Sequence, residues 1–483
     1  MGESVKIPAF ANGFYTSQNP GADCELCFNF YPERLESPGA KTEWVLYPCP
    51  GFSLVTTLSP GPIRGMWAQN GLTIIVSGFN VYLSTDSFVT NMSLIGTVAV
   101  DANPAIITSN GAGGNQIFLT SGNTGYSYDI GTTAFNTEIT GATTCDFLDG
   151  YILVLDATTS TLKISDLNDA TGWTSTQVAQ RTQGGDTWVA MKVINSDIWL
   201  MGSQTSEAWY NQGTFPFPFG PRQGAFIQQG AASAFSMASL NSTLIWLSHN
   251  AQGSGMVNRL DGYSPVRIST HALEFAIQGY ARINDAVGFV YQEQGHTFYV
   301  LNFPTANATW VFDAATNLWH QRGYWNANLT TFQTYRVQYF CHTEDNFNLA
   351  GDRLTGAVYR ISITQATEVD GLGIRRLRRF RAVSQDEKYL FYSNLQFDME
   401  TGTALSAGQG SDPQLMLSWS NDGGHTFSSE IWASAGVRGD YGARAMFRGR
   451  LGRARNRVFD LIVSDPIPWR INSAFIDVEE GTW

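Results

Sequence analysis

Histidine and carboxylate residues that could act together in catalysis gather in residues 267–322. His271 lies three residues before Glu274, and His296 lies ahead of Asp313 in the same segment. A histidine beside a carboxylate is a common general base, so a hydrolase is one interpretation. The six histidines are, however, scattered without metal-ligand spacing, and no Gly-x-Ser-x-Gly motif presents a nucleophilic serine. We therefore predict that these residues are structural, with no catalytic residue, metal or cofactor.

The cysteines give no metal site either. There are five, Cys24, Cys27, Cys49, Cys145 and Cys341. The first two have the spacing of half a zinc site, but no second pair of cysteines or histidines completes it. We expect reduced thiols, as in a protein made in a cytoplasm. Residues 1–10 also lack the basic start and apolar run of a signal peptide.

A turn motif near the C-terminus resembles the Asp-box of sialidase-like propellers. Its defining residues are Ser420, Asp422, Gly424 and Thr426. The aspartate is expected to accept amide hydrogens while the glycines allow positive φ, which pins a hairpin. A glycosidase would need two suitably separated carboxylates, and the sequence singles out no such pair. One copy of the motif therefore predicts a structural turn.

Arginine is concentrated in two C-terminal runs, and only five of the 29 basic residues are lysines. The candidate residues are Arg375, Arg376, Arg378, Arg379 and Arg381 in the first run and Arg450, Arg453 and Arg455 in the second. In an extended chain Arg376, Arg378 and Phe380 share one face. The arginines either form salt bridges within or between subunits, which the net charge of −12 favours, or contact DNA phosphates.

Three phenylalanines alternate with prolines in residues 215–221. They are Phe215, Phe217 and Phe219. The prolines exclude a central ladder strand, and three phenylalanines are costly to leave in water. The loop either packs on its own core or inserts into a partner.

The composition is that of a large β protein. The chain has 483 residues and 48 glycines, with 13% aromatic and 14% charged residues, which favours a large apolar core and strands joined by tight turns. The net charge of −12 argues against a general nucleic-acid binder with a basic face. No apolar stretch is long enough to span a bilayer.

One pattern recurs from about residue 63 to 365: an apolar strand, a turn rich in Gly, Asn or Ser, and a strand ending in an aromatic residue or Asp. Copies start roughly 35 to 55 residues apart, the period of propeller blades. A ring of about six or seven blades would bury every copy against its neighbours, and a stack of β-sandwich domains is the alternative. We predict an all-β fold with an irregular, proline-broken N-terminal arm over 1–60, a β-propeller-like body over 61–368 and a sandwich-like antiparallel region over 369–483.

Several segments together resemble the tail-hub proteins of short-tailed bacteriophages, described as packaged-DNA stabilisation proteins. The arm contributes Asn-Phe-Tyr-Pro-Glu at 29–33 and Pro-Gly-Phe at 50–52. The body contributes residues 223–230, 269–271 and 295–319, and the C-terminal region contributes 419–423 and 449–455. The likeness spans most of the chain.

The resemblance implies a structural virion protein rather than an enzyme. A hexamer would form a nozzle below the portal and its adaptor ring, retain packaged DNA, seat the tail fibres or spikes and the tail-tip needle, and become part of the ejection channel. The protein would assemble in the host cytoplasm and reside in the phage tail. Two alternatives stay open, namely a sialidase-like propeller that hydrolyses glycans and a propeller that binds host glycans through exposed aromatics such as Trp325 or Trp432.

Overall fold

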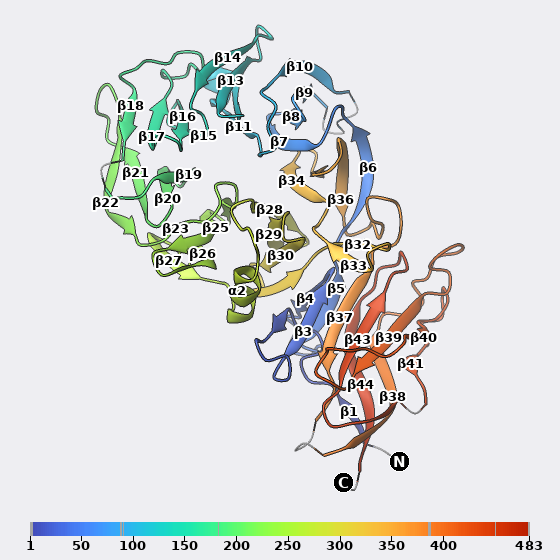
Figure 1. The fold of residues 1–483 in the computed structure, drawn as a ribbon. Coiled ribbons are helices and arrows are strands. Elements are labelled where there is room, and N and C mark those ends of the chain that lie inside the picture. Colours follow the sequence, from blue (N-terminus) through green and yellow to red (C-terminus); the bar gives the residue numbers. More distant parts are fainter. Residues whose placement is uncertain are drawn as a thin grey trace.

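The computed structural model of the protein describes residues 3–86, 89, 91–181, 183–384, 388–449 and 451–481. Within them the chain is almost entirely β-sheet, with two short helices, α1 (Gly111–Gly114) and α2 (His271–Gln278). The strands form a ring of radial sheets and, beside it, a two-layered unit built from strands of both chain ends (Figure 1). No described helix is long and apolar enough to cross a membrane.

Seven sheets of the described chain form the blades of a β-propeller. Blades 1 to 4 each contain four consecutive strands. Blade 1 contains β7 (Ile63–Gln69), β8 (Leu72–Ser77), β9 (Asn80–Ser84) and β10 (Ser93–Thr97), and blade 2 contains β11 (Ile106–Ser109), β12 (Gln116–Ser121), β13 (Thr124–Asp129) and β14 (Phe135–Thr140). Blade 3 contains β15 (Thr144–Leu148), β16 (Tyr151–Asp156), β17 (Thr161–Ile164) and β18 (Val178–Gln180), and blade 4 contains β19 (Trp188–Ile194), β20 (Asp197–Gly202), β21 (Ser206–Asn211) and β22 (Phe219–Ile227). Tight turns join them: Asn70 and Gly71, between β7 and β8, both have positive φ, as a two-residue hairpin requires.

Blades 5 to 7 complete the ring. Blade 5 contains β23 (Gly230–Ala231), β24 (Ala238–Leu240), β25 (Thr243–Asn250), β26 (Gly253–Asp261) and β27 (Ser264–Arg267). Blade 6 contains β28 (Val287–Glu293), β29 (His296–Phe303), β30 (Ala308–Asp313) and β31 (Leu318–Gln321). Blade 7 contains β34 (Val337–His342), β35 (Asn348–Asp352), β36 (Ala357–Ser362) and β6 (Gly51–Thr57). The last blade takes its outer strand, β6, from the N-terminal part of the chain. Its inner strand, β34, lies against β7 of blade 1. The ring is therefore closed by a blade that combines strands from after blade 6 with β6, which precedes blade 1 in the chain.

Apolar side chains fill the spaces between blades. Ile74 and Val76 of blade 1, for example, share a buried cluster with Ile117 and Leu119 of blade 2. Burying such a side chain stabilises the fold by about 1.5–3 kcal/mol, and no blade could bury both faces alone. The innermost strands surround a central cavity of about 200 Å³. Lys192, which lines it, forms an ion pair with Asp146 at 2.9 Å.

The second unit is a β-sandwich of two layers. One layer contains β2 (Tyr15–Thr16), β3 (Cys24–Phe28), β37 (Arg376–Arg381), β43 (Val458–Val463), β39 (Gln414–Ser420) and β40 (Ile431–Ser434). The other contains β1 (Glu3–Lys6), β4 (Phe30–Arg34), β5 (Trp44–Pro48), β44 (Ile471–Glu480), β38 (Leu390–Met399), β41 (Ala445–Phe447) and β42 (Gly452–Ala454). Their inner faces share one buried cluster that includes Phe380, Phe397 and Phe459.

The propeller and the sandwich are joined through a continuous sheet. Strand β3 pairs in parallel with β31 of blade 6 on one side and antiparallel with β37 on the other. A hairpin of β32 (Tyr324–Asn326) and β33 (Thr331–Gln333) follows blade 6, and its Phe332 stacks on Phe28 of β3 at 4.3 Å between ring centroids. The two units therefore meet through backbone pairing as well as side-chain packing.

The predicted all-β fold, the propeller and the C-terminal sandwich-like region are confirmed, and the stack of sandwich domains is not found. The N-terminal segment differs from the expectation, because residues 1–60 are not an irregular arm. Strands β1 to β5 belong to the sandwich and β6 to the propeller. Pro32 is compatible with a strand here because β4 lies at the edge of its layer, where a missing N–H costs little.

Candidate functional site

The first arginine run forms β37, and its side chains alternate between the sandwich interior and the surface. Arg376 and Arg378 are only 1% and 0% exposed. Arg378 donates hydrogen bonds to the carbonyl oxygens of Ala9, Phe10, Gly13 and Leu26 and to the carboxylate of Glu25. Since all these acceptors belong to the N-terminal segment, Arg378 fastens that segment to the sandwich.

The other arginines of this run also have partners within the chain. Arg379 forms a bidentate ion pair with Asp460 on the neighbouring β43, at 2.7 and 2.8 Å. Arg381 donates to the side chain of Asn456 and to the carbonyl oxygens of Pro20 and Gly21. Arg375 pairs with Glu430 at 3.2 Å and lies 4.3 Å from the ring centroid of Trp325.

These contacts favour the salt-bridge interpretation of the first run over DNA binding. Arg376 and Arg378 are buried and cannot reach a phosphate outside the protein. Burial lowers the pKa of Arg376 to about 10, and its guanidinium donates to the carbonyl oxygens of Ile374 and Cys49. The run is thus an internal scaffold in which cationic side chains satisfy backbone carbonyls.

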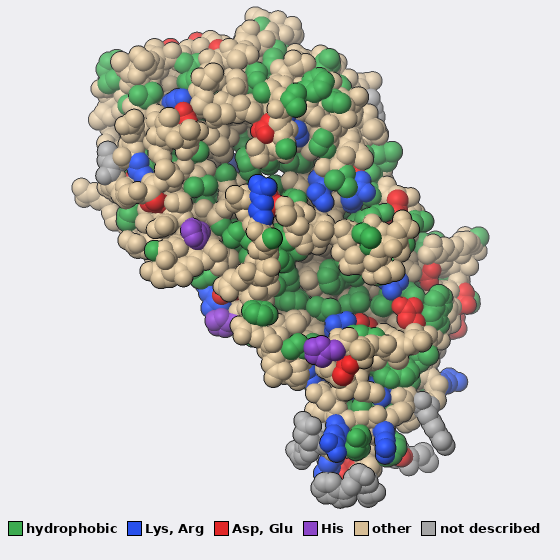
Figure 2. Space-filling view, viewed as in Figure 1, with side chains coloured by type: hydrophobic (Ala, Val, Ile, Leu, Met, Phe, Trp, Pro, Cys, Tyr) green, Lys and Arg blue, Asp and Glu red, His purple; other side chains and the backbone are tan. Residues whose placement is uncertain are grey.

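The second run lies at the far end of the sandwich and is exposed. Arg453 and Arg455 both lie over the ring of Tyr389, at 4.9 and 4.5 Å from its centroid, and neither forms an ion pair within the described chain. We call these three residues the arginine tip, and Figure 2 shows Lys and Arg side chains around this end of the molecule. Arg450 lies outside the described residues. Arg457 is buried and donates to the side chain of Asn421, so it belongs to the scaffold.

The Asp-box-like residues form a hydrogen-bonded turn after β39. Asp422 accepts from the backbone N–H groups of His425 and Thr426, from the Thr426 hydroxyl and from the Ser420 hydroxyl. These bonds, that of Ser420 first, hold the pKa of the Asp422 carboxyl well below its usual range. Gly424 has a φ of 96°, which few other residues adopt. The turn lies in the sandwich, not in a propeller blade.

The proline-rich loop divides its three phenylalanines between core and solvent. Phe219 is buried, and Phe217 packs at 6.1 Å from it and at 6.3 Å from Trp209. Phe215, in the middle of the loop between β21 and β22, is 97% exposed. Packing on its own core therefore accounts for two of the three rings, and only Phe215 is available to a partner.

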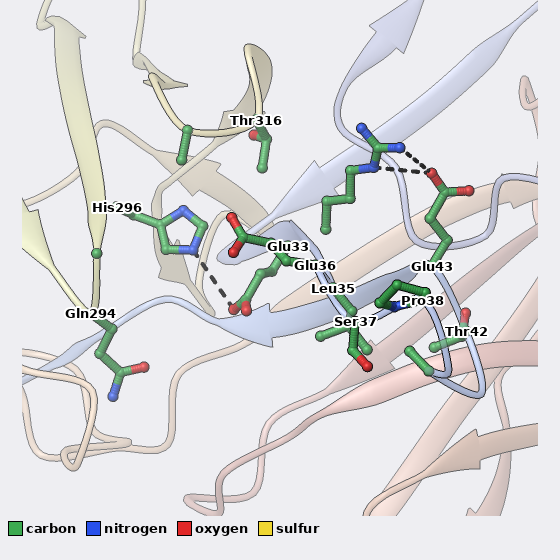
Figure 3. A pocket seen from close by; sticks show the side chains of 14 residues that line it. Glu33, Leu35, Glu36, Ser37, Pro38, Thr42, Glu43, Gln294, His296 and Thr316 are labelled. Carbon is green, nitrogen blue, oxygen red and sulfur yellow. Dashed lines mark hydrogen bonds and ion pairs between the residues drawn. The ribbon is translucent and has the colours of Figure 1, made fainter.

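His296 lines a cleft of about 830 Å³ between the β4–β5 hairpin and blade 6 (Figure 3). His296 is 6% exposed. Its Nδ1 lies 2.7 Å from the Asp313 carboxylate, and its Nε2 faces Glu33 at 3.7 Å. Burial alone would lower the pKa of His296, but the hydrogen bond and charge of Asp313, aided by Glu33, raise it overall.

The other histidines of this segment are either paired or buried away from solvent. Arg267 forms a bidentate ion pair with Glu274, at 2.6 and 2.9 Å, and its guanidinium also lies 2.9 Å from His271 Nδ1. His320 is fully buried, and burial together with Arg322 lowers its pKa well below the usual range. The Arg267–Glu274 pair thus joins β27 of blade 5 to α2, and these residues do not assemble a catalytic set.

No metal centre is found in the described part of the chain, where no three His, Cys, Asp or Glu side chains are grouped to hold an ion. All five cysteines are buried free thiols. Burial raises the pKa of Cys27 and of Cys341 to about 12, so neither is a ready thiolate ligand at neutral pH.

Comparison with protein families decides the identity of the fold. The sequence matches the bacteriophage P22 Gp10 β-propeller family over residues 5–366 and the bacteriophage P22 Gp10 β-sandwich family over residues 376–479. The chain belongs to the bacteriophage P22 Gp10 family. It is therefore a structural tail-hub protein of the short-tailed phages, as the resemblance predicted, and not an enzyme.

Other comparisons add only distant likeness to this Gp10-family chain. Curated proteins give no match. Among solved structures, the N-terminal domain of Nup159 is 11% identical, with a TM-score of 0.41, and the match covers 70% of this chain and 98% of that one. The extracellular domain of the putative hybrid two-component system BT4673 from B. thetaiotaomicron is 8% identical, with a TM-score of 0.42, covering 73% of this chain and 44% of that one.

Sequence reasoning missed the partners that matter most in this Gp10-family protein. Glu25 and Glu33 stand in the segment expected to be irregular, yet they meet Arg378 and His296 from distant parts of the chain. Asn29 bridges the two units in the same way, donating to the carbonyl oxygens of Gly323 and Arg375. No local pattern marks these residues, because their partners are brought together only by the fold.

Proposed function

We propose that copies of this chain form a hexameric tail hub, or nozzle, below the portal and its adaptor ring. The nozzle retains the packaged DNA and forms part of the channel through which it is ejected. The observation that carries the proposal is the match of both structural units, the propeller and the sandwich, to the P22 Gp10 family. Assembly takes place in the host cytoplasm, before the protein is built into the virion tail.

The rigid link between the two units supports this role. The shared sheet through β3 and the bridging Asn29 both resist movement of the sandwich against the propeller. A subunit that cannot bend at its centre suits a ring that must hold packaged DNA under load. Buried, fully paired polar groups give such rigidity more effectively than a flexible linker.

The charge distribution supports a channel in which DNA slides. The net charge is −12, and the arginines of β37 are occupied within the subunit. We propose that the inner wall is mainly acidic, so that it repels the phosphate backbone instead of retaining it. Any phosphate contact would then be made by the arginine tip, whose Arg453 and Arg455 are free of ion pairs within the described chain.

Phe215 supports a docking role for the β21–β22 loop. A fully exposed phenylalanine is unfavourable in an isolated subunit and becomes favourable when a partner covers it. We propose that this loop inserts into a neighbouring tail component. The candidates are a second copy, the portal-adaptor ring, a tail fibre or spike, and the tail-tip needle.

Electron microscopy of the purified protein and of virion tails tests the proposal. A hexameric ring immediately below the neck of the particle is the expected result. A soluble monomer that is absent from particles would overturn it. For the loop, Phe215→Ser should reduce incorporation into particles, whereas Phe275→Ser, at an exposed position of α2, should not.

A further inference from the structure

A second cleft, of about 390 Å³, opens between blades 4 and 5. The turn between β19 and β20 forms one wall, and the turns of blade 5 after β24 and β26 form the other. Asn195 donates to the carbonyl oxygen of Ser242 at 2.7 Å and thereby ties the two walls together. The cleft is separate from the His296 cleft and from the arginine tip, and nothing in the proposed hub function uses it.

One side of this cleft is an aromatic platform held in place by hydrogen bonds. Tyr263 is 41% exposed, and its hydroxyl donates to Asp197 at 2.6 Å. Arg222 binds the same carboxylate at 3.0 and 2.6 Å and lies over the rings of Tyr210 and Tyr263, at 4.3 and 5.7 Å. The ring of Tyr263 is therefore fixed in orientation while part of its surface stays open to the cleft.

The same cleft contains polar groups that have no partner in the described chain. Arg259, half-buried, and Asp261, exposed, both line the cleft, and neither side chain makes a hydrogen bond or an ion pair. Trp199, only 2% exposed, also lines it.

Free donors, a free acceptor and a fixed aromatic face are the groups that recognise a sugar. Vicinal hydroxyls can accept from a guanidinium and donate to a carboxylate, while the C–H face of the ring packs on an aromatic side chain. Because the charges of Arg259 and Asp261 are opposite, these two side chains together favour a neutral ligand over an ionic one. Its volume lies in the range of ordinary small-ligand pockets. We infer that this cleft binds a neutral saccharide.

Saturation-transfer NMR and calorimetry on the full-length protein test the inference. The probes are glucose, galactose, mannose and N-acetylglucosamine, together with an array of bacterial oligosaccharides. We expect binding of at least one of them. Tyr263→Ala, Arg259→Gln and Asp261→Asn should each weaken the affinity about tenfold, which corresponds to the loss of one good contact. Tyr263→Phe, which keeps the ring, should bind more tightly than Tyr263→Ala.

Tyr441→Ala, at a 79% exposed tyrosine of the sandwich, is the matched control and should leave binding unchanged. Arg259→Gln and Asp261→Asn guard against misfolding, because neither removes the hydrogen bond between Tyr263 and Asp197. The inference would be overturned if the wild-type protein bound no saccharide, or if all three cleft variants bound as tightly as the wild type. The result does not depend on ring formation, because the cleft lies within one subunit.

Discussion

Two arginine-rich segments of the sandwich differ in burial and in their partners. On β37, Arg376 and Arg378 are buried and donate to carbonyl oxygens of the N-terminal part of the chain. At the arginine tip, Arg453 and Arg455 lie on the surface over Tyr389 and have no acidic partner in the described chain. The two segments have similar composition, so the difference comes from what the fold places opposite each of them.

Arginine density alone therefore does not identify a nucleic-acid surface. A guanidinium has five N–H donors, which makes it suitable for collecting several backbone carbonyls at a buried junction. The same group on a surface is a candidate phosphate contact. Exposure, not the number of arginines, separates the two roles, and substitutions in each segment should have different effects.

The largest effect is expected for Arg378→Ala. It removes the buried donor shared by Glu25 and four carbonyl oxygens, and should lower the free energy of unfolding by about 3–5 kcal/mol. Urea denaturation followed by tryptophan fluorescence measures the change. Arg455→Ala is the control from the tip. Equal destabilisation by the two variants would remove the distinction between scaffold and tip.

A smaller loss is expected for Arg379→Ala, because the Arg379 side chain is 20% exposed and water can replace it beside Asp460. Asp460 would stay buried without its bidentate partner, and we expect a destabilisation of about 1–3 kcal/mol. Arg379→Ala with Asp460→Asn should be more stable than Arg379→Ala alone, as a double-mutant cycle would reveal. An additive result would mean that the pair contributes no coupling energy.

His296 should make the stability depend on pH. Its pKa in the folded protein is raised above the ordinary value of 6.5, so its contribution is complete below that value and is lost as pH rises through the folded pKa. We expect the melting temperature to fall as the pH rises above about 6.5, because His296 stabilises the fold only while its imidazole is protonated. His296→Gln should flatten this slope, whereas the exposed His425→Gln should not. If the melting temperature of His296→Gln depended on pH as that of the wild type does, the contact of His296 with Asp313 and Glu33 would not be the cause of the pH dependence.

The smallest effect on stability, within about 0.5 kcal/mol, is expected for the tip variant Arg453→Ala/Arg455→Ala. If the tip contacts phosphates, the same variant should bind DNA with a weaker salt dependence. The slope of log K against log salt concentration should decrease in magnitude by about 1–2. Titration of a duplex at several salt concentrations measures it. Arg34→Ala, an exposed arginine paired with Glu43, is the control. Identical slopes for both variants would leave the tip without a role in DNA contact.

Much of the propeller could be predicted because its information is local. Each blade repeats strand, turn and strand within a short stretch, and turns such as Asn70-Gly71 have the residues that positive φ favours. The N-terminal strands could not be predicted in this way. Pro32 in β4 and the partners of β3 and β6 depend on segments hundreds of residues away, so the local pattern resembled an irregular arm.

The candidate sites show the same division. The Asp-box-like turn was predictable because Ser420, Asp422 and Thr426 satisfy one another within seven residues. The histidine segment was recognised as structural, but Glu33, which faces His296, carries no local signal. The saccharide cleft combines two blades, and Arg259 and Tyr263 have no sequence pattern that pairs them with Trp199.

The sequence by itself determined that Arg376, Arg378 and Phe380 share one face of a strand, because side chains alternate along an extended chain. It did not determine which face is inward. Only the tertiary structure places the face with two arginines inside, because the N-terminal segment runs past it and presents carbonyl oxygens and Glu25 as acceptors. Burial of a charge depends on its partners, and here the partners come from the other end of the chain.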